Sequence, residues 1–280
     1  MVENQHRELL ISHLVNAAIK AGAAIMEIYN SSQTFDISIK SDNTPITAAD
    51  RAAHNSIKES LGATRIPILS EEGREMRYAE RRNWELFWLV DPLDGTVEFI
   101  DRNNEFTVNI ALMSDKKCIM SVIYVPYLSK LYFAERDNGA YVCVNVAPNS
   151  GSNLSYSEFS ISCEAIPRSH PPRPNPKVAI SRSHNTPDTY AHIDRLRTRF
   201  PKLEVVEQGS SYKFCMLAEG SVDYYVRTTH TSEWDTAAGE LILSEVGGST
   251  LTLDDNQKLQ YNKEDLHNPY FVCRSCNCPI

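Results

Sequence analysis

Carboxylates recur at four places in this sequence, next to apolar or helix-forming segments. Asp50 lies in TPITAAD, Glu71 in LSEEG, Asp91 and Asp94 in WLVDPLDGTVEF, and Asp235 in SEWDTAAGELIL. Taken singly, each has an ordinary explanation as a turn residue, a solvated loop residue or an acid in the first turn of a helix. Four such segments in one chain point instead to a shared site.

A shared carboxylate site implies a cation, because clustered carboxylates repel one another unless a positive charge neutralises them. Mg²⁺ takes oxygen ligands and usually sits on a few carboxylates together with the phosphate oxygens of a substrate. The pattern therefore predicts a magnesium site that acts on a phosphorylated molecule.

Hydrophobic periodicity predicts the elements that position these residues in the first half of the chain. Apolar residues at helical spacing indicate a helix over 6–29. Thr47 is expected to cap a second helix that runs to about Leu61, with Asp50 as the acidic capping partner at its third position. The remaining predicted elements are strands at 35–40, 66–70 and 86–90, and an antiparallel meander at 105–114, 118–126 and 130–136.

The middle of the chain changes character at residues 145–176, which are rich in Asn, Ser and Pro and contain one strand-like run, FSISCEAI. This segment is predicted to be a domain junction or a long surface insertion. We therefore expect an N-terminal α+β part, residues 1–170, that carries an antiparallel sheet and the metal site, and a smaller C-terminal α/β part, residues 171–280. The elements predicted in the second part are a strand in KVAISRSH, helices at 187–199, 210–219 and 235–246, and strands at 203–206, in VDYYVR and in GGSTLTL.

Composition narrows the function class. The 280 residues include 42% hydrophobic residues and carry a net charge of −8, so a large core is possible but nucleic acid and anionic membranes are poor partners. The N-terminus lacks the basic start of a signal peptide, and no apolar run approaches the roughly 18 residues of a membrane span. We expect a cytoplasmic protein.

The seven cysteines are scattered and odd in number, which favours reduced thiols in a cytosol-like compartment. Three of them, Cys273, Cys276 and Cys278, lie close together at the C-terminus. A structural zinc site needs four ligands, so we interpret this cluster as a frayed, thiol-rich tail rather than a metal or redox site.

An ordered set of motifs extends these inferences: SDNTPITAAD, LSEE, WLVDPLDGTVEFIDRNNEFTVNIAL, ISRSH, GSSYKFCMLAEG and WDTAAG. Together they resemble the bacterial-type 3′(2′),5′-bisphosphate nucleotidases of the inositol monophosphatase superfamily, which are lithium-sensitive, Mg²⁺-dependent phosphatases. The resemblance runs from about residue 9 to about residue 272. It implies a mixed α+β and α/β fold in αβαβα layers, with the site between the two parts. It also implies a monomer that hydrolyses adenosine 3′,5′-bisphosphate to AMP and phosphate, and acts on the sulfated analogue, phosphoadenosine phosphosulfate.

The same resemblance implies a set of metal ligands. Glu71 and Asp91 are expected to bind Mg²⁺, with Asp91 bridging two ions and the backbone carbonyl of Leu93 completing one shell. Asp94 and Asp235 would hold the second ion. Two ions about 4 Å apart can hold both the attacking and the leaving oxygen of a phosphoryl transfer. A third, weaker ion is expected beside Glu71, and Li⁺ should inhibit by taking a Mg²⁺ position.

Catalytic and phosphate-binding roles follow from the neighbouring residues. By resemblance, Asp50 accepts a hydrogen bond from Thr96, and Thr96 in turn polarises the attacking water. The backbone N–H groups of Gly95 and Thr96, which open a short helix, suit the phosphate that is cleaved.

Nucleotide specificity is expected in the second half. By resemblance, the nucleotide contacts there are Ser181, His184, Ser210 and Lys213. Further candidates are Ser183, which follows the same strand, Arg227 and the metal ligand Asp235. Lys213 would meet the second phosphate. One departure from the family pattern is Val97, at a position where relatives often carry Lys.

Two other functions remain open from the sequence. An inositol monophosphatase or inositol polyphosphate 1-phosphatase would use the same metal site, although a substrate with one phosphate needs no second cation such as Lys213. A regulatory protein that binds the nucleotide or Li⁺ without hydrolysis is less favoured, because the expected ligands and the Asp50–Thr96 pair are all present.

Overall fold

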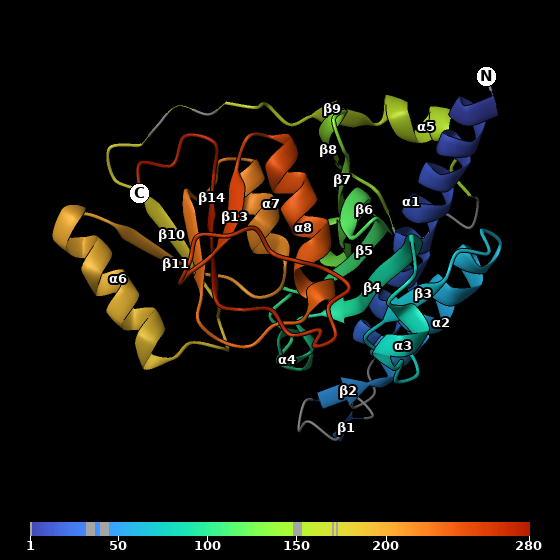
Figure 1. Ribbon diagram of the computed structural model, residues 1–280, viewed down its shortest axis with the longest axis horizontal. Coiled ribbons are helices and arrows are strands. Elements are labelled where there is room, and N and C mark those ends of the chain that lie inside the picture. The colour runs from blue at the N-terminus through green and yellow to red at the C-terminus, as the bar shows by residue number, and fades with distance from the viewer. Residues whose placement is uncertain (1, 32–36, 40–44, 148–152, 170, 172) are drawn as a thin grey trace.

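The structure is a computed structural model and describes residues 2–31, 37–39, 45–147, 153–169, 171 and 173–280. It consists of alternating helical and sheet layers (Figure 1). In order, these are a helix pair, a seven-stranded sheet, a second helix pair, a five-stranded sheet and one outer helix. The predicted αβαβα fold is therefore confirmed.

The first helical layer consists of α1 (Val2–Tyr29) and α2 (Ala48–Gly62). Their apolar faces pack with one side of the seven-stranded sheet in a core that includes Ile11, Leu14 and Trp88. The helix α2 begins as predicted, with Thr47 and Asp50 forming a capping box. A short two-stranded sheet, β1 (Ile37–Ile39) and β2 (Pro45–Thr47), precedes it.

A stretch of α1, Gln5–Tyr29, is long and apolar enough to cross a membrane, which the sequence analysis did not expect. However, 61% of its most apolar window is buried inside the protein. The side chains of Ile11, Leu14 and Ile25 are fully buried against the sheet. The helix therefore has the packing of a core helix.

The seven-stranded sheet has the order β3-β4-β5-β6-β7-β8-β9. Only β3 and β4 are parallel, and the other neighbours form an antiparallel meander. Its strands are β3 (Ile68–Ser70), β4 (Leu86–Asp94), β5 (Thr107–Ser114), β6 (Lys117–Val125), β7 (Lys130–Glu135), β8 (Gly139–Cys143) and β9 (Cys163–Ala165). The short helices α3 (Tyr78–Arg81) and α4 (Thr96–Ile100) flank β4, and a 3₁₀ turn, Pro126–Leu128, joins β6 to β7.

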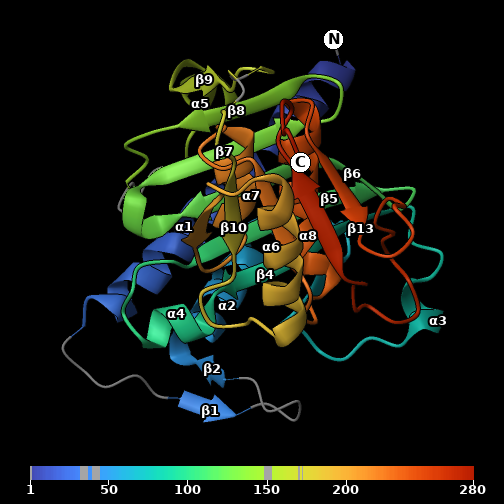
Figure 2. The ribbon, with the colours of Figure 1, turned by 90° about the vertical axis from the view of Figure 1, so that its left-hand side faces the viewer.

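The five-stranded sheet has the order β11-β10-β12-β14-β13, in which β10, β11 and β12 are parallel and β13 and β14 antiparallel. Its strands are β10 (Lys177–Ile180), β11 (Glu204–Glu207), β12 (Tyr224–Arg227), β13 (Ser249–Thr252) and β14 (Phe271–Arg274). Figure 2 shows the outermost helix, α6 (Pro187–Arg199), in front of this sheet. The parallel strands agree with the predicted α/β character of the second half.

The helices α7 (Tyr212–Ala218) and α8 (Glu233–Glu245) lie between the two sheets. Their side chains join one continuous core with residues of both sheets, including Phe87, Phe214 and Phe271. Because this middle layer packs against both sheets, the two halves of the chain share a large core. The division at about residue 170 stays a prediction.

Several sequence predictions were wrong or incomplete. The run FSISCEAI, residues 159–166, is only partly a strand. Its first three residues end the short helix α5 (Tyr156–Ile161), which a capping box of Ser155 and Glu158 starts, and Cys163–Ala165 form the predicted strand as β9. The strands β8 and β14 were missed. The C-terminal thiols do not form a frayed tail, since Cys273 lies in β14 and is fully buried. The ends of the predicted strand 35–40 lie outside the described residues.

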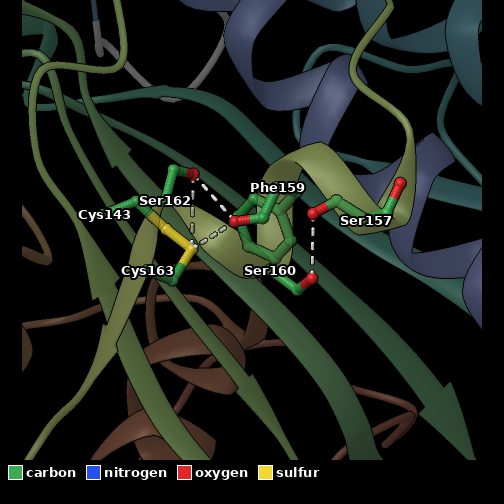
Figure 3. Close-up of a disulfide and its surroundings, with 6 residues drawn as sticks. All are labelled: Cys143, Ser157, Phe159, Ser160, Ser162 and Cys163. Carbon is green, nitrogen blue, oxygen red and sulfur yellow. Dashed lines mark hydrogen bonds between the residues drawn. A yellow bond between two sulfur atoms is a disulfide. The ribbon is translucent and has the colours of Figure 1, made fainter.

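The expectation that all seven thiols are reduced is also wrong. Cys143 and Cys163 form a disulfide that joins β8 to β9 at directly paired positions and closes a chain separation of 20 residues (Figure 3). The enclosed segment carries α5, and both backbone groups of Leu154 bond to the side-chain amide of Asn16 on α1, at 2.8 Å each. Leu154 and Cys163 of this segment are therefore held to α1 and to the edge of the sheet, respectively.

Candidate active site

The site forms where β3 and β4 end. Because these strands are parallel, their C-terminal ends meet at one edge, which brings Glu71 beside the Asp91–Asp94 segment. Residues three apart on a regular strand face opposite sides of a sheet. Here Asp91 pairs with Asn109 and Asp94 with Thr107, so one extra residue bulges out of β4 and restores a common direction for the two carboxylates.

Three carboxylates converge at this edge. Each of Glu71, Asp91 and Asp235 offers an oxygen that lies within 4.8 Å of the others. Burial, followed by the charges of Glu71 and Asp94, raises the pKa of Asp91 well above its usual range. Burial and the charge of Asp94 raise the pKa of Asp235 to about 8. A set of crowded carboxylate oxygens of this kind fits a hard divalent cation.

Asp94 lies beside this group but is held separately. Its Oδ2 accepts a hydrogen bond from the backbone N–H of Ser211 at 2.5 Å and one from the amide of Asn109 at 3.4 Å. Burial raises the pKa of Asp94, and the charge of Lys213 opposes that shift. The partners of Asp94 therefore come from β5 and from the loop before α7.

The predicted Asp50–Thr96 pair is present. The Thr96 hydroxyl lies 3.1 Å from Asp50 Oδ1 and 3.3 Å from the Leu93 carbonyl oxygen. The other oxygen of Asp50 accepts from the Thr47 N–H at 2.7 Å and from the Thr47 hydroxyl at 2.6 Å. The capping box of α2 thus fixes the Asp50 carboxylate in the orientation that reaches Thr96.

Gly95 turns the chain from β4 into α4 with φ +89°, a conformation that other residues rarely adopt. A Cβ atom here would lie 2.9 Å from the Glu105 carbonyl oxygen. Both the backbone angle and the close approach therefore require glycine.

One cavity contains nearly all the predicted site residues. Its lining includes Glu71, Asp91, Leu93, Asp94, Gly95, Thr96, Ser181, His184, Ser210, Lys213, Arg227 and Asp235. Val97, the expected departure from the family pattern, also lines the cavity. Asp50 and Ser183 are not part of this lining. Asp50 is connected to the cavity through its bond with Thr96, and the Ser183 hydroxyl donates to Glu98 Oε1 at 2.6 Å.

The two predicted cations differ in their pairing. Lys213 Nζ donates to the carbonyl oxygens of Gln208 and Ser210, at 2.8 and 2.6 Å, so it helps to close the loop before α7. Burial lowers the pKa of Lys213 to about 8. Arg227 makes a 3.4 Å bond to the His230 carbonyl, and its buried Nε has no hydrogen-bond partner within the described part of the chain.

Two glutamates that the sequence analysis missed connect the halves of the chain around this cavity. Glu105 accepts two hydrogen bonds from Arg182, at 2.6 and 2.7 Å, and a third from the backbone N–H of Gly209 at 2.7 Å. Glu98 is 2% exposed and accepts from Ser183. No local pattern in the sequence marked Glu98 or Glu105 as functional, because their hydrogen-bond partners lie about 80 to 100 residues away along the chain.

Comparison with known proteins agrees with this geometry. Residues 6–275 match the inositol monophosphatase family, and the chain belongs to this family.

Two curated relatives and one solved structure share the name CysQ. The chain is 38% identical over 253 residues to the 3′(2′),5′-bisphosphate nucleotidase CysQ of Buchnera aphidicola, covering 90% of this chain and 87% of that protein. It is 33% identical to the same-named protein of Haemophilus influenzae, covering 96% and 93%. The crystal structure of CysQ from Bacteroides thetaiotaomicron, a bacterial member of the family, has a TM-score of 0.84 and 42% identity, covering 94% of this chain and 96% of that one. The inositol monophosphatase of Thermotoga maritima, at 20% identity and a TM-score of 0.71, shows the shared fold alone.

Proposed function

We propose that this protein is a Mg²⁺-dependent phosphomonoesterase that hydrolyses adenosine 3′,5′-bisphosphate to AMP and phosphate. The observation that carries the proposal is one cavity in which Glu71, Asp91 and Asp235 crowd together and Arg227 offers an incompletely paired guanidinium. The names of the CysQ relatives, which align over most of the chain, support the nucleotide as substrate.

Glu71, Asp91, Asp94, Asp235 and the Leu93 carbonyl would hold the ions. When bound, Mg²⁺ neutralises phosphate charge and favours ionisation of a nucleophilic water. The crowding of the carboxylates and the raised pKa of Asp91 support this assignment, because both are costs that a divalent cation removes. We propose two ions, with a third weaker one beside Glu71, and inhibition by Li⁺.

The residues of the chain would orient the nucleophile and the substrate. Thr96 can donate its hydroxyl proton to Asp50, which leaves the oxygen of Thr96 free to accept a hydrogen bond from a water. A water held in this way presents a lone pair to phosphorus, as in-line attack requires. The backbone N–H groups at Gly95 and Thr96 would bind the oxygens of the phosphate that is cleaved.

The second phosphate of the nucleotide would meet Arg227. Lys213 already donates to two carbonyl groups, so we propose that it orders the loop and adds positive charge, whereas Arg227 makes the direct contact. Ser181, His184 and Ser210 line the remaining wall. An inositol monophosphate would leave Arg227 without an anionic partner, and the inositol phosphatases among the structural matches are only 20% and 22% identical to this chain.

The remaining expectations stay proposals. These are activity on phosphoadenosine phosphosulfate, a monomeric state, a cytoplasmic location and the absence of nucleic-acid or membrane partners. The disulfide between Cys143 and Cys163 counts against a reducing compartment such as the cytoplasm, because such bonds are rare there.

The test is phosphate release by the purified protein in Mg²⁺, with adenosine 3′,5′-bisphosphate and inositol 1-phosphate compared at equal concentrations, each with and without Li⁺. We expect a strong preference for the nucleotide and loss of activity in Li⁺. Preference for the inositol phosphate would refute the proposed substrate and leave the metal site standing. No release from either, with Mg²⁺ present, would refute the enzyme.

A further inference from the structure

The carboxylate of Asp94 is held by the loop that precedes α7. The backbone N–H of Ser211 donates to Asp94 Oδ2 at 2.5 Å, across a sequence separation of 117 residues. The bond joins the end of β4 in the first sheet to a helix of the middle layer. A carboxylate that accepts from a backbone N–H is fixed in both orientation and charge.

The backbone of this loop is shaped for that contact. Ser210 has φ +54°, a left-handed conformation that is uncommon for residues other than glycine, and Ser211 follows in the right-handed helical region. Consecutive residues of opposite hand turn their N–H groups to one side and form a concavity for an anion. Here the anion beside the loop is Asp94 itself. An uncommon conformation that persists at a candidate site supports a functional role.

The hydroxyl of Ser211 anchors the loop to β5. It donates to Asn109 Oδ1 at 2.6 Å and lies 2.8 Å from the Thr107 hydroxyl. The amide of Asn109 in turn points to Asp94 at 3.4 Å. Thr107, Asn109 and Ser211 are at most 4% exposed, so water does not compete for these bonds.

From this network we propose that Ser211 is a positioning residue that couples the nucleotide-binding loop to the metal ligand Asp94. The inference rests on the proposed function. Ser210 in the loop and Lys213 in the first turn of α7 line the substrate cavity, and Ser211 between them holds the carboxylate through its N–H. Ordering of the loop by the nucleotide therefore fixes Asp94 in its ion-binding orientation.

Coupling of this kind is reciprocal. If the second phosphate, bound by Arg227 and attracted by the charge of Lys213, orders the loop, it tightens the binding of the divalent ion, and the ion tightens the binding of the nucleotide by the same factor. A nucleotide with a single phosphate should produce less of this effect, because it engages only the metal side.

The first experiment measures metal binding directly, without turnover. Binding of Mn²⁺ to the purified full-length protein is followed by the loss of its free EPR signal, for wild type, Ser211→Ala and Ser121→Ala. Ser121 is a matched control, because it is a buried serine whose hydroxyl donates to the Ala238 carbonyl oxygen at 3.1 Å. Ser211→Ala keeps the backbone N–H but removes the hydroxyl bond to Asn109 that holds this N–H against Asp94. We expect it to weaken Mn²⁺ binding by about 10-fold or more, as disruption of an outer-shell contact does, and Ser121→Ala to leave it unchanged.

A second variant keeps the test valid if Ser211→Ala folds poorly. Asn109→Leu removes the bonds on the other side of the same network, and we expect a similar loss of Mn²⁺ affinity. The double variant should bind Mn²⁺ no more weakly than the worse single variant, because both substitutions break one path. Fully additive losses, or unchanged Mn²⁺ binding in both single variants, would overturn the role of Ser211.

The second experiment measures the coupling. The Mg²⁺ concentration for half-maximal activity is compared with adenosine 3′,5′-bisphosphate and with 3′-AMP. In wild type we expect it to be about 5-fold or more lower with the bisphosphate, a typical coupling factor, and nearly equal for the two substrates in Ser211→Ala. Equal ratios in the two proteins would refute the coupling. Absence of metal binding and of hydrolysis in wild type would instead refute the proposed function.

Discussion

Replacement of Asp91 by Asn should make the metal-free protein more stable while abolishing its activity. In the metal-free state, Asp91 is 1% exposed and its oxygen lies within 4.8 Å of those of Glu71 and Asp235. Two charges at 4.8 Å repel by about 3.5 kcal/mol at an effective dielectric constant of about 20. Protonation of Asp91 limits this cost. Protonating a carboxyl with an ordinary pKa of 3.8 costs about 4 kcal/mol at pH 7, so the repulsion can destabilise the folded state by no more than that amount.

We therefore expect the free energy of unfolding to rise by about 2–4 kcal/mol in Asp91→Asn, measured in EDTA at pH 7 by thermal and urea denaturation. Added Mg²⁺ should make wild type the more stable of the two proteins. A bound ion stabilises the folded state more the tighter it binds, and the variant lacks one of the carboxylates that would bind Mg²⁺. Phosphate release should fall by more than about 100-fold.

The stability of the metal-free protein should depend on pH. Folding raises the pKa values of Asp91 and Asp235, the latter to about 8, so the folded metal-free protein binds more protons than the unfolded chain. The contribution of these two carboxyls to stability should be fully present below about pH 4 and be lost as the pH rises towards 8, and Asp91→Asn should flatten that slope. Asp254→Asn, which removes an exposed charge, is the control and should change stability by less than about 0.5 kcal/mol. A metal-free Asp91→Asn protein that is no more stable than wild type at pH 8 would refute the crowding of the carboxylates.

Three further predictions follow from the geometry. Thr96→Val should lower kcat by about 10²–10⁴ with little change in KM, as expected for a group that orients a nucleophile; in steady-state assays, a rise in KM alone would contradict this role. Arg227→Met should raise KM for adenosine 3′,5′-bisphosphate by about 10–100-fold, since a charge-assisted bond is worth about 1.5–3 kcal/mol, and should leave KM for 3′-AMP nearly unchanged; equal effects on both would show that Arg227 does not meet the second phosphate. Replacing Cys143 and Cys163 together by Ser should lower the free energy of unfolding by about 3 kcal/mol, the loop-closure value for their separation of 20 residues, with kcat unchanged; equal stability of the oxidised and reduced wild type in urea would show that the disulfide contributes nothing.

Local signals in the sequence were sufficient for most elements. The capping box of Thr47 and Asp50 marked the start of α2, and alternating apolar residues marked the β5–β7 meander, because both patterns depend on neighbours within one or two turns or strands. The run FSISCEAI misled because a cap at Ser155 outweighed its alternation. The strand β14 was missed because it is a short run next to polar and cysteine residues and gains its burial from distant segments, which are β12, β13 and α7.

The chemical character of the site was also determined by the sequence alone. The residue types and order of Asp50, Glu71, Asp91, Asp94 and Asp235 fixed a carboxylate set suited to Mg²⁺, because ligand preference is a property of the side chains themselves.

Only the tertiary structure decided how these groups are used. The bulge at the end of β4 turns two carboxylates to one side, and the packing of the two halves places Ser211 against Asp94. Lys213 donates to carbonyl groups of the loop before α7, whereas Arg227 is left incompletely paired. Each of these outcomes depends on contacts between segments far apart in the chain, or on a backbone angle such as that of Ser210. No local pattern encodes such contacts, because their partners become neighbours only when the two sheets share a core.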